Sequence, residues 1–64
     1  MKRFCIEYYK GDKIIHKEYD SSYHFTNLLI KLGFKDIHGL YVNGDRLDSS
    51  PENAHKVCKR YLRE

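Results

Sequence analysis

A tight hairpin turn is encoded in Gly39-Leu40-Tyr41-Val42-Asn43-Gly44-Asp45-Arg46-Leu47, and the rest of the chain can be interpreted outward from it. Asn43 and Gly44 can both take the positive φ angles that the two central residues of a type I′ turn require. Apolar residues flank this pair on both sides. The pattern predicts a β-hairpin, with one strand at residues 37–42 and a short strand at residues 46–47.

The N-terminal part of the chain predicts another hairpin. Its first strand alternates from residue 3 to residue 9, so that one face carries Phe4, Ile6 and Tyr8 and the other carries Cys5, Glu7 and Tyr9. A turn at residues 10–13 leads to a second extended segment at residues 14–19, which is rich in β-branched and aromatic residues.

The second strand of this hairpin has two possible registers. One face would carry Ile14, His16 and Glu18, and the other would carry Ile15, Lys17 and Tyr19. We expect Ile15 and Tyr19 to point inward. Lys17 then lies on an edge strand, where its charge discourages pairing with another chain.

Two amphipathic helices are predicted. The first follows the possible N-caps Asp20, Ser21 and Ser22 and buries a stripe spaced i, i+3, i+4 and i+7, namely Phe25, Leu28, Leu29 and Leu32. Gly33 is placed to end it in the left-handed conformation. The second helix begins at Ser49-Ser50-Pro51-Glu52, a serine cap followed by proline. Its apolar stripe consists of Ala54, Val57, Cys58, Tyr61 and Leu62.

The element order is strand, strand, helix, strand, short strand, helix (ββαββα), which is typical of a single α+β domain over residues 1–64. The helix after the first hairpin works as a crossover. Since such connections are right-handed, we expect the third strand to run parallel to the first, in a mixed sheet with a C-terminal helix.

Residues 4–48 resemble a ubiquitin-like β-grasp domain. The resemblance is carried by a hairpin, a capped helix, and an apolar strand that leads through Asn43-Gly44 to Arg46-Leu47-Asp48. It implies a compact sheet whose exposed face docks other macromolecules. The chain departs from the family by ending Tyr61-Leu62-Arg63-Glu64 without a diglycine, so we expect no covalent conjugation.

Composition favours a folded domain without a membrane span. Twelve Lys and Arg against nine Asp and Glu give a net charge of +3, which mildly favours anionic partners. No run approaches the roughly 18 apolar residues of a membrane-spanning helix. No pattern of a signal peptide precedes Cys5, so we expect Cys5 and Cys58 to be reduced, buried thiols in a cytoplasmic protein.

We expect no catalytic residue, no metal site and no cofactor. The four histidines have no His-x-x-x-His spacing, and the two cysteines form no Cys-x-x-Cys pair. Ser22, Ser49 and Ser50 stand directly before helical periods, as caps do. The sequence therefore predicts a protein that is not an enzyme.

Two surfaces are candidates for binding. The sheet face opposite the first helix is expected to carry Tyr9 and Tyr41, near Ile14, Glu7 and His16. The alternative is that the C-terminal helix covers this face and makes the tyrosines part of the core. The second surface is a basic stripe on that helix, formed by Lys56, Lys59, Arg60 and Arg63.

We expect a small, non-catalytic module that binds a larger protein through the sheet face and acts as an inhibitor or adaptor. The alternative is a small basic protein that binds nucleic acid through the C-terminal helix. The two differ in salt dependence, because phosphate contacts weaken steeply as ionic strength rises.

Overall fold

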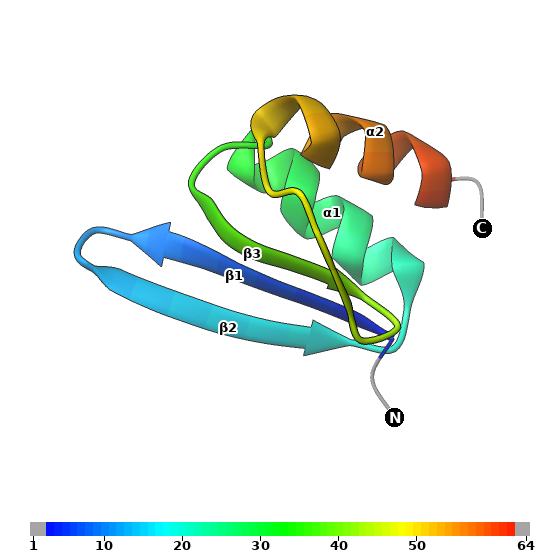
Figure 1. Ribbon diagram of the computed structural model, residues 1–64, viewed down its shortest axis with the longest axis horizontal. Helices are drawn as coiled ribbons and strands as arrows, with labels where there is room; N and C mark the ends of the chain where they lie inside the picture. Colours follow the sequence, from blue (N-terminus) through cyan, green and yellow to red (C-terminus); the bar gives the residue numbers. More distant parts are fainter. Residues whose placement is uncertain (1–2, 63–64) are drawn as a thin grey trace.

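The computed structural model describes residues 3–62 and has the predicted element order (Figure 1). The elements are β1 (Phe4–Lys10), β2 (Lys13–Tyr19), α1 (Ser22–Leu32), β3 (Ile37–Val42), β4 (Asp45–Leu47) and α2 (Pro51–Tyr61). Four strands form one sheet, in the order β2-β1-β3-β4. The α+β class and the ββαββα order are confirmed.

The strand directions differ from the prediction. β1 pairs antiparallel with β2 and also antiparallel with β3, and β3 pairs antiparallel with β4. The expected parallel pairing of the first and third strands is wrong, and the sheet is antiparallel rather than mixed. The crossover rule applies to the strands that α1 joins, β2 and β3. These two run in the same direction, with β1 inserted between them.

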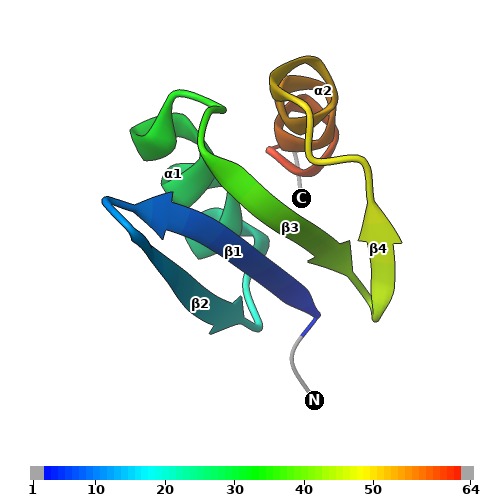
Figure 2. The same cartoon turned by 60° about the vertical axis from the view of Figure 1, so that its left-hand side comes forward.

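Both helices lie on one face of the sheet (Figures 1 and 2). They contact each other, and residues from α1, α2, β1 and β3 share one core, which consists of Phe4, Ile6, Phe25, Leu29, Ile37, Leu40, Val42, Ala54, Val57 and Cys58. The alternative in which α2 covers the tyrosines of the opposite face is therefore wrong. We call that opposite face the open face.

The register of the first hairpin is the expected one. Tyr8 lies opposite Ile15, Ile6 opposite Lys17, and Phe4 opposite Tyr19, so Ile15 and Tyr19 share the core-facing side with buried β1 residues. β2 is an edge strand, and Lys17 is exposed on it. The inward-facing charge is one of the ways in which edge strands avoid pairing with other chains.

The helix ends follow the predicted capping. The Ser21 hydroxyl accepts a hydrogen bond from the Tyr23 amide (3.1 Å), and Gly33 ends α1 with φ 67°. Ser50 caps α2. Leu62 was expected in the buried stripe of α2, and this is wrong: its side chain is 57% exposed. Leu62 lies about 100° around the helix from Tyr61, at the border of the apolar stripe.

We expect Leu29→Ala to lower the free energy of unfolding by about 2 to 5 kcal/mol, because Leu29 is fully buried in the core. Urea unfolding measures this loss. Ile30→Ala on the same helix is the matched control, since Ile30 is 49% exposed. Equal losses for the two variants would contradict the assigned inner face of α1.

Asn43 and Gly44 both have positive φ (53° and 85°), as the predicted turn requires. A Cβ at Gly44 would meet no atom within 4 Å, so a substitution there strains only the backbone. We expect Gly44→Val to cost about 1 to 3 kcal/mol in thermal or urea unfolding. Gly44→Asn should cost less, because asparagine tolerates the left-handed region. Equal stability of the Val variant and the wild type would show that the turn does not constrain the fold.

Candidate protein-binding face

The open face is built from the outward-pointing residues of all four strands. Strand alternation and pairing place on it Cys5, Glu7, Tyr9, Ile14, His16, Glu18, Tyr41 and Arg46. The five residues predicted to bind a partner, Glu7, Tyr9, Ile14, His16 and Tyr41, therefore lie together on one surface. The signals that located them were the alternation of the strands and the turn at residues 43–44.

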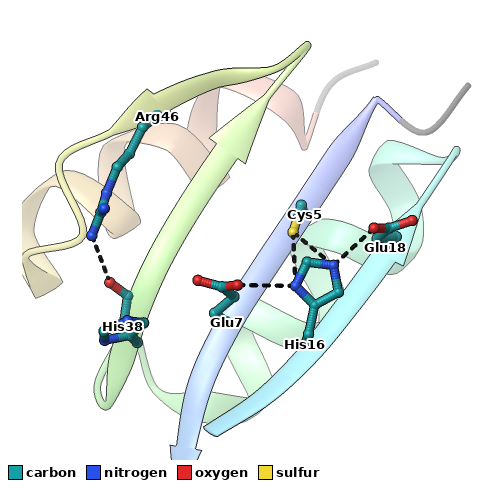
Figure 3. Close-up of polar contacts among 6 residues, drawn as sticks. All are labelled: Cys5, Glu7, His16, Glu18, His38 and Arg46. Carbon is teal, nitrogen blue, oxygen red and sulfur yellow. Dashed lines mark hydrogen bonds and ion pairs between the residues drawn. The ribbon is translucent and has the colours of Figure 1, made fainter.

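A Glu-His-Glu cluster, formed by Glu7, His16 and Glu18, joins β1 to β2 on this face (Figure 3). His16 Nδ1 lies 3.0 Å from Glu7 Oε2, and His16 Nε2 lies 2.8 Å from Glu18 Oε2. Each ring nitrogen faces a carboxylate oxygen, so both hydrogen bonds are formed when both nitrogens carry a proton, as in the imidazolium. The hydrogen bond to Glu18, and next the one to Glu7, raise the pKa of His16 above its ordinary value.

Cys5 lies against this cluster without being activated by it. Its Sγ is 3.6 Å from Nδ1 and 3.5 Å from Nε2 of His16. A sulfur equally far from the two nitrogens does not lie along the N–H direction of either one. Partial burial, and then the negative charges of Glu7 and Glu18, raise the pKa of the Cys5 thiol. This arrangement opposes the thiolate that nucleophilic catalysis requires.

The Tyr41 ring packs over Gly39, which has no side chain, in the middle of the sheet. A Cβ at Gly39 would lie 2.7 Å from Glu7 Oε1 and 2.9 Å from Tyr41 Cε2, so only glycine allows these side chains to approach so closely. On the other side, the Arg46 guanidinium lies 5.8 Å from the centroid of the Tyr41 ring. Arg46 also donates from Nη2 to the His38 carbonyl oxygen, over 3.3 Å (Figure 3).

An irregularity in the pairing of β1 and β3 brings His38 to Tyr9. Glu7 pairs with Gly39 but Tyr8 pairs with Ile37, so β3 has one extra residue at this point. The Tyr9 hydroxyl lies 2.8 Å from His38 Nδ1. The sequence did not predict that His38 contacts Tyr9 or that Arg46 binds the His38 carbonyl. Gly39, a glycine inside an apolar strand, is the signal that could have indicated the bulge.

Among the surface hollows of the described residues, two are lined by several of the predicted residues, and a third includes Tyr9. The open-face hollow measures about 380 Å³ and is lined by Arg3, Phe4, Cys5, Glu7, His16, Glu18, Tyr41 and Gly44. The second hollow measures about 540 Å³ and lies along α2, where it is lined by Asn53, Lys56, Val57, Lys59 and Arg60.

The basic stripe of α2 is exposed. Lys56, Lys59 and Arg60 all point to solvent, and Lys56 Nζ lies 3.9 Å from Glu52 Oε1. An exposed ion pair of this kind contributes little to stability. Arg63, the fourth residue predicted for the stripe, lies outside the described residues.

Among residues 3–62, no group of three or more His, Cys, Asp or Glu side chains is arranged to hold a metal ion. No helix in the same part of the chain is long and apolar enough to cross a membrane. Comparisons with models of known protein families, with curated proteins and with solved structures find no match. The resemblance to the β-grasp family therefore stays a prediction.

The Glu-His-Glu cluster makes stability depend on pH. The folded state holds the His16 proton more tightly than the unfolded chain, so the stabilisation is complete below about pH 6.5 and is lost as pH rises through the raised pKa of His16. We expect the free energy of unfolding to fall by about 1 kcal/mol or less across this window, since the cluster is exposed.

Urea unfolding at a series of pH values from about 5.5 to 8.5 tests this expectation. His16→Gln should reduce the decrease of the free energy of unfolding between low and high pH. Glu52→Gln, which removes an exposed carboxylate from α2, should leave it unchanged. A wild-type stability that rises over the window would contradict the assigned bridging of His16.

Proposed function

We propose that this protein is a small, non-catalytic binding module that occupies a surface of a larger protein through its open face, as an inhibitor or an adaptor. The observation that carries the proposal is the placement of both helices on one side of the sheet, which leaves the other side uncovered by any element of residues 3–62.

The composition of the open face supports a protein partner. Tyr9 and Ile14 lie opposite each other at the turn end of the first hairpin and are 46% and 50% exposed. Tyrosine supplies a large contact area with few rotatable bonds and is enriched where binding energy concentrates. The Glu-His-Glu cluster and Arg46 add polar groups that can fix the orientation of a partner.

The size of the chain fits such a role. The accessible surface is 4575 Å². A standard protein interface buries about 800 Å² on each partner, which is roughly one sixth of this surface.

The chemistry of the site supports a non-catalytic role. The thiol of Cys5 is held protonated by burial and by two neighbouring carboxylates, and both nitrogens of His16 are engaged. While His16 bridges the two carboxylates, the thiol has no free general base beside it. The expectation of a cytoplasmic location accords with the free thiols of Cys5 and Cys58 and stays a prediction.

A second candidate function is nucleic-acid binding through α2. The observation that favours it is the hollow bordered by Lys56, Lys59 and Arg60, three exposed cations on one helix. Three phosphate contacts would make log K fall with log salt with a slope of about −2.7 on duplex DNA. Binding by the open face should depend much less on salt, because its tyrosines carry the affinity.

We expect Tyr9→Ala combined with Tyr41→Ala to weaken partner binding at least thirtyfold, since a tyrosine at a binding hot spot contributes about 2 kcal/mol or more. A partner isolated from a lysate of the source organism is titrated against each variant by calorimetry. Tyr23→Ala is the matched control, because Tyr23 is 68% exposed on α1. It should bind like the wild type.

Melting temperatures are measured first, because Tyr41 also covers Gly39. The charge-reversal variant Lys59→Glu with Arg60→Glu should change mainly the association rate and its salt dependence. If this variant abolished binding while the folded tyrosine variant bound normally, the open face would be excluded and α2 would be the binding surface.

A further inference from the structure

The open-face hollow lies beside two carboxylates that share one cation, and that cation belongs to the protein itself. Glu7 and Glu18 hold the His16 ring between them through its two N–H groups. The side chains remain accessible: His16 is 48% exposed, Glu18 50% and Glu7 25%. A cation from solvent or from a partner can therefore reach the same carboxylates.

The geometry of the cluster specifies the cation that can replace the ring. Imidazolium presents two N–H donors held apart by one carbon, and a guanidinium group presents two N–H donors with nearly the same separation. Both groups are planar and spread their charge over the plane. An ammonium group is a compact point charge and cannot reproduce this paired arrangement.

One aromatic side chain that lines the hollow already contacts a guanidinium group. The Arg46 guanidinium lies 5.8 Å from the centroid of the Tyr41 ring, and Tyr41 lines the hollow. Aromatic faces of this kind attract a planar cation, and arginine more often than lysine.

We propose that the open-face hollow receives an arginine side chain of the partner protein, whose guanidinium replaces the His16 ring between Glu7 and Glu18. The inference rests on the proposed function and names the chemistry of the partner. Charge complementarity supports it: with His16 neutral, the charged groups that line the hollow are two carboxylates and the single cation Arg3.

Arginine then competes with the proton of His16. The groups that face the ring are Glu7 and Cys5 from β1 and Glu18 from β2, and Arg3 and Tyr41 also line the hollow. A neutral His16 has only one N–H group, so it releases at least one of its two carboxylates and binding tightens as pH rises. Below the pKa of His16, the apparent Kd changes by up to tenfold for each unit of pH.

The test uses the full chain and the probe Nα-acetyl-L-arginine amide, with Nα-acetyl-L-citrulline amide as the uncharged control of equal shape. Backbone amide chemical shifts are followed by NMR during each titration. We expect saturable shifts at Glu7, His16, Glu18 and Tyr41 with the arginine probe and none with citrulline. The Kd should fall at least about threefold between pH 6 and pH 8.

Variants separate the carboxylates from the competing ring. Glu7→Gln with Glu18→Gln should weaken probe binding at least about tenfold. Asp12→Asn with Glu52→Gln removes the same charge from exposed positions elsewhere and should bind like the wild type. His16→Ala keeps both carboxylates, and it should bind the probe more tightly at pH 6 and lose the pH dependence.

Equal shifts with citrulline, full binding by the double glutamine variant, or an unchanged pH dependence in His16→Ala would each overturn the proposal. A titration with zinc chloride alone that saturates at these residues, while arginine does not bind, would overturn it in favour of a metal ligand. Loss of partner binding in the tyrosine variant together with a failed arginine titration would keep the proposed function and reject only the arginine anchor.

Discussion

The stacking of Phe4 on Phe25 is the contact on which the rest of the structure depends. The two ring centroids are 4.6 Å apart, and both side chains are fully buried. Tyr61 meets Phe4 edge-on at 5.3 Å and Phe25 at 6.2 Å, so one residue each from β1, α1 and α2 forms a single aromatic group. This group fixes both helices to the same side of the sheet. The buried core contains no side chain from the open face, so the open face is not needed to form the core.

Features governed by neighbouring residues could be predicted from the sequence. The turn at residues 43–44, the caps Ser21 and Ser50, and the inward faces of both hairpin strands follow from local backbone preference and from side-chain alternation. The direction of β3 relative to β1 could not be predicted from the sequence, because it depends on contacts between residues far apart in the chain. The crossover rule governs β2 and β3, the strands that α1 joins, and does not determine the direction of β3 relative to β1.

The chemistry of the candidate site was predicted less completely than its position. Alternation placed Glu7 and His16 on one face, but the bridging of His16 by two carboxylates depends on the register that pairs Glu7 with His16 and Cys5 with Glu18. The bulge that brings His38 to Tyr9 depends on one extra residue in β3. Composition and spacing contain neither of these facts, because both arise only when the strands are aligned.

The separation of the core from the open face has a consequence for a domain of this size. A chain of about 60 residues is stabilised by a small margin, so most changes to its core unfold it. Tyr9, Ile14 and His16 are exposed on the face that the core does not use, so we expect their substitution to cost little stability. Tyr41 is the exception, because its ring covers the backbone at Gly39. If the open face binds a partner as proposed, it can therefore be adapted to that partner everywhere except at its centre, where Tyr41 would serve both binding and folding.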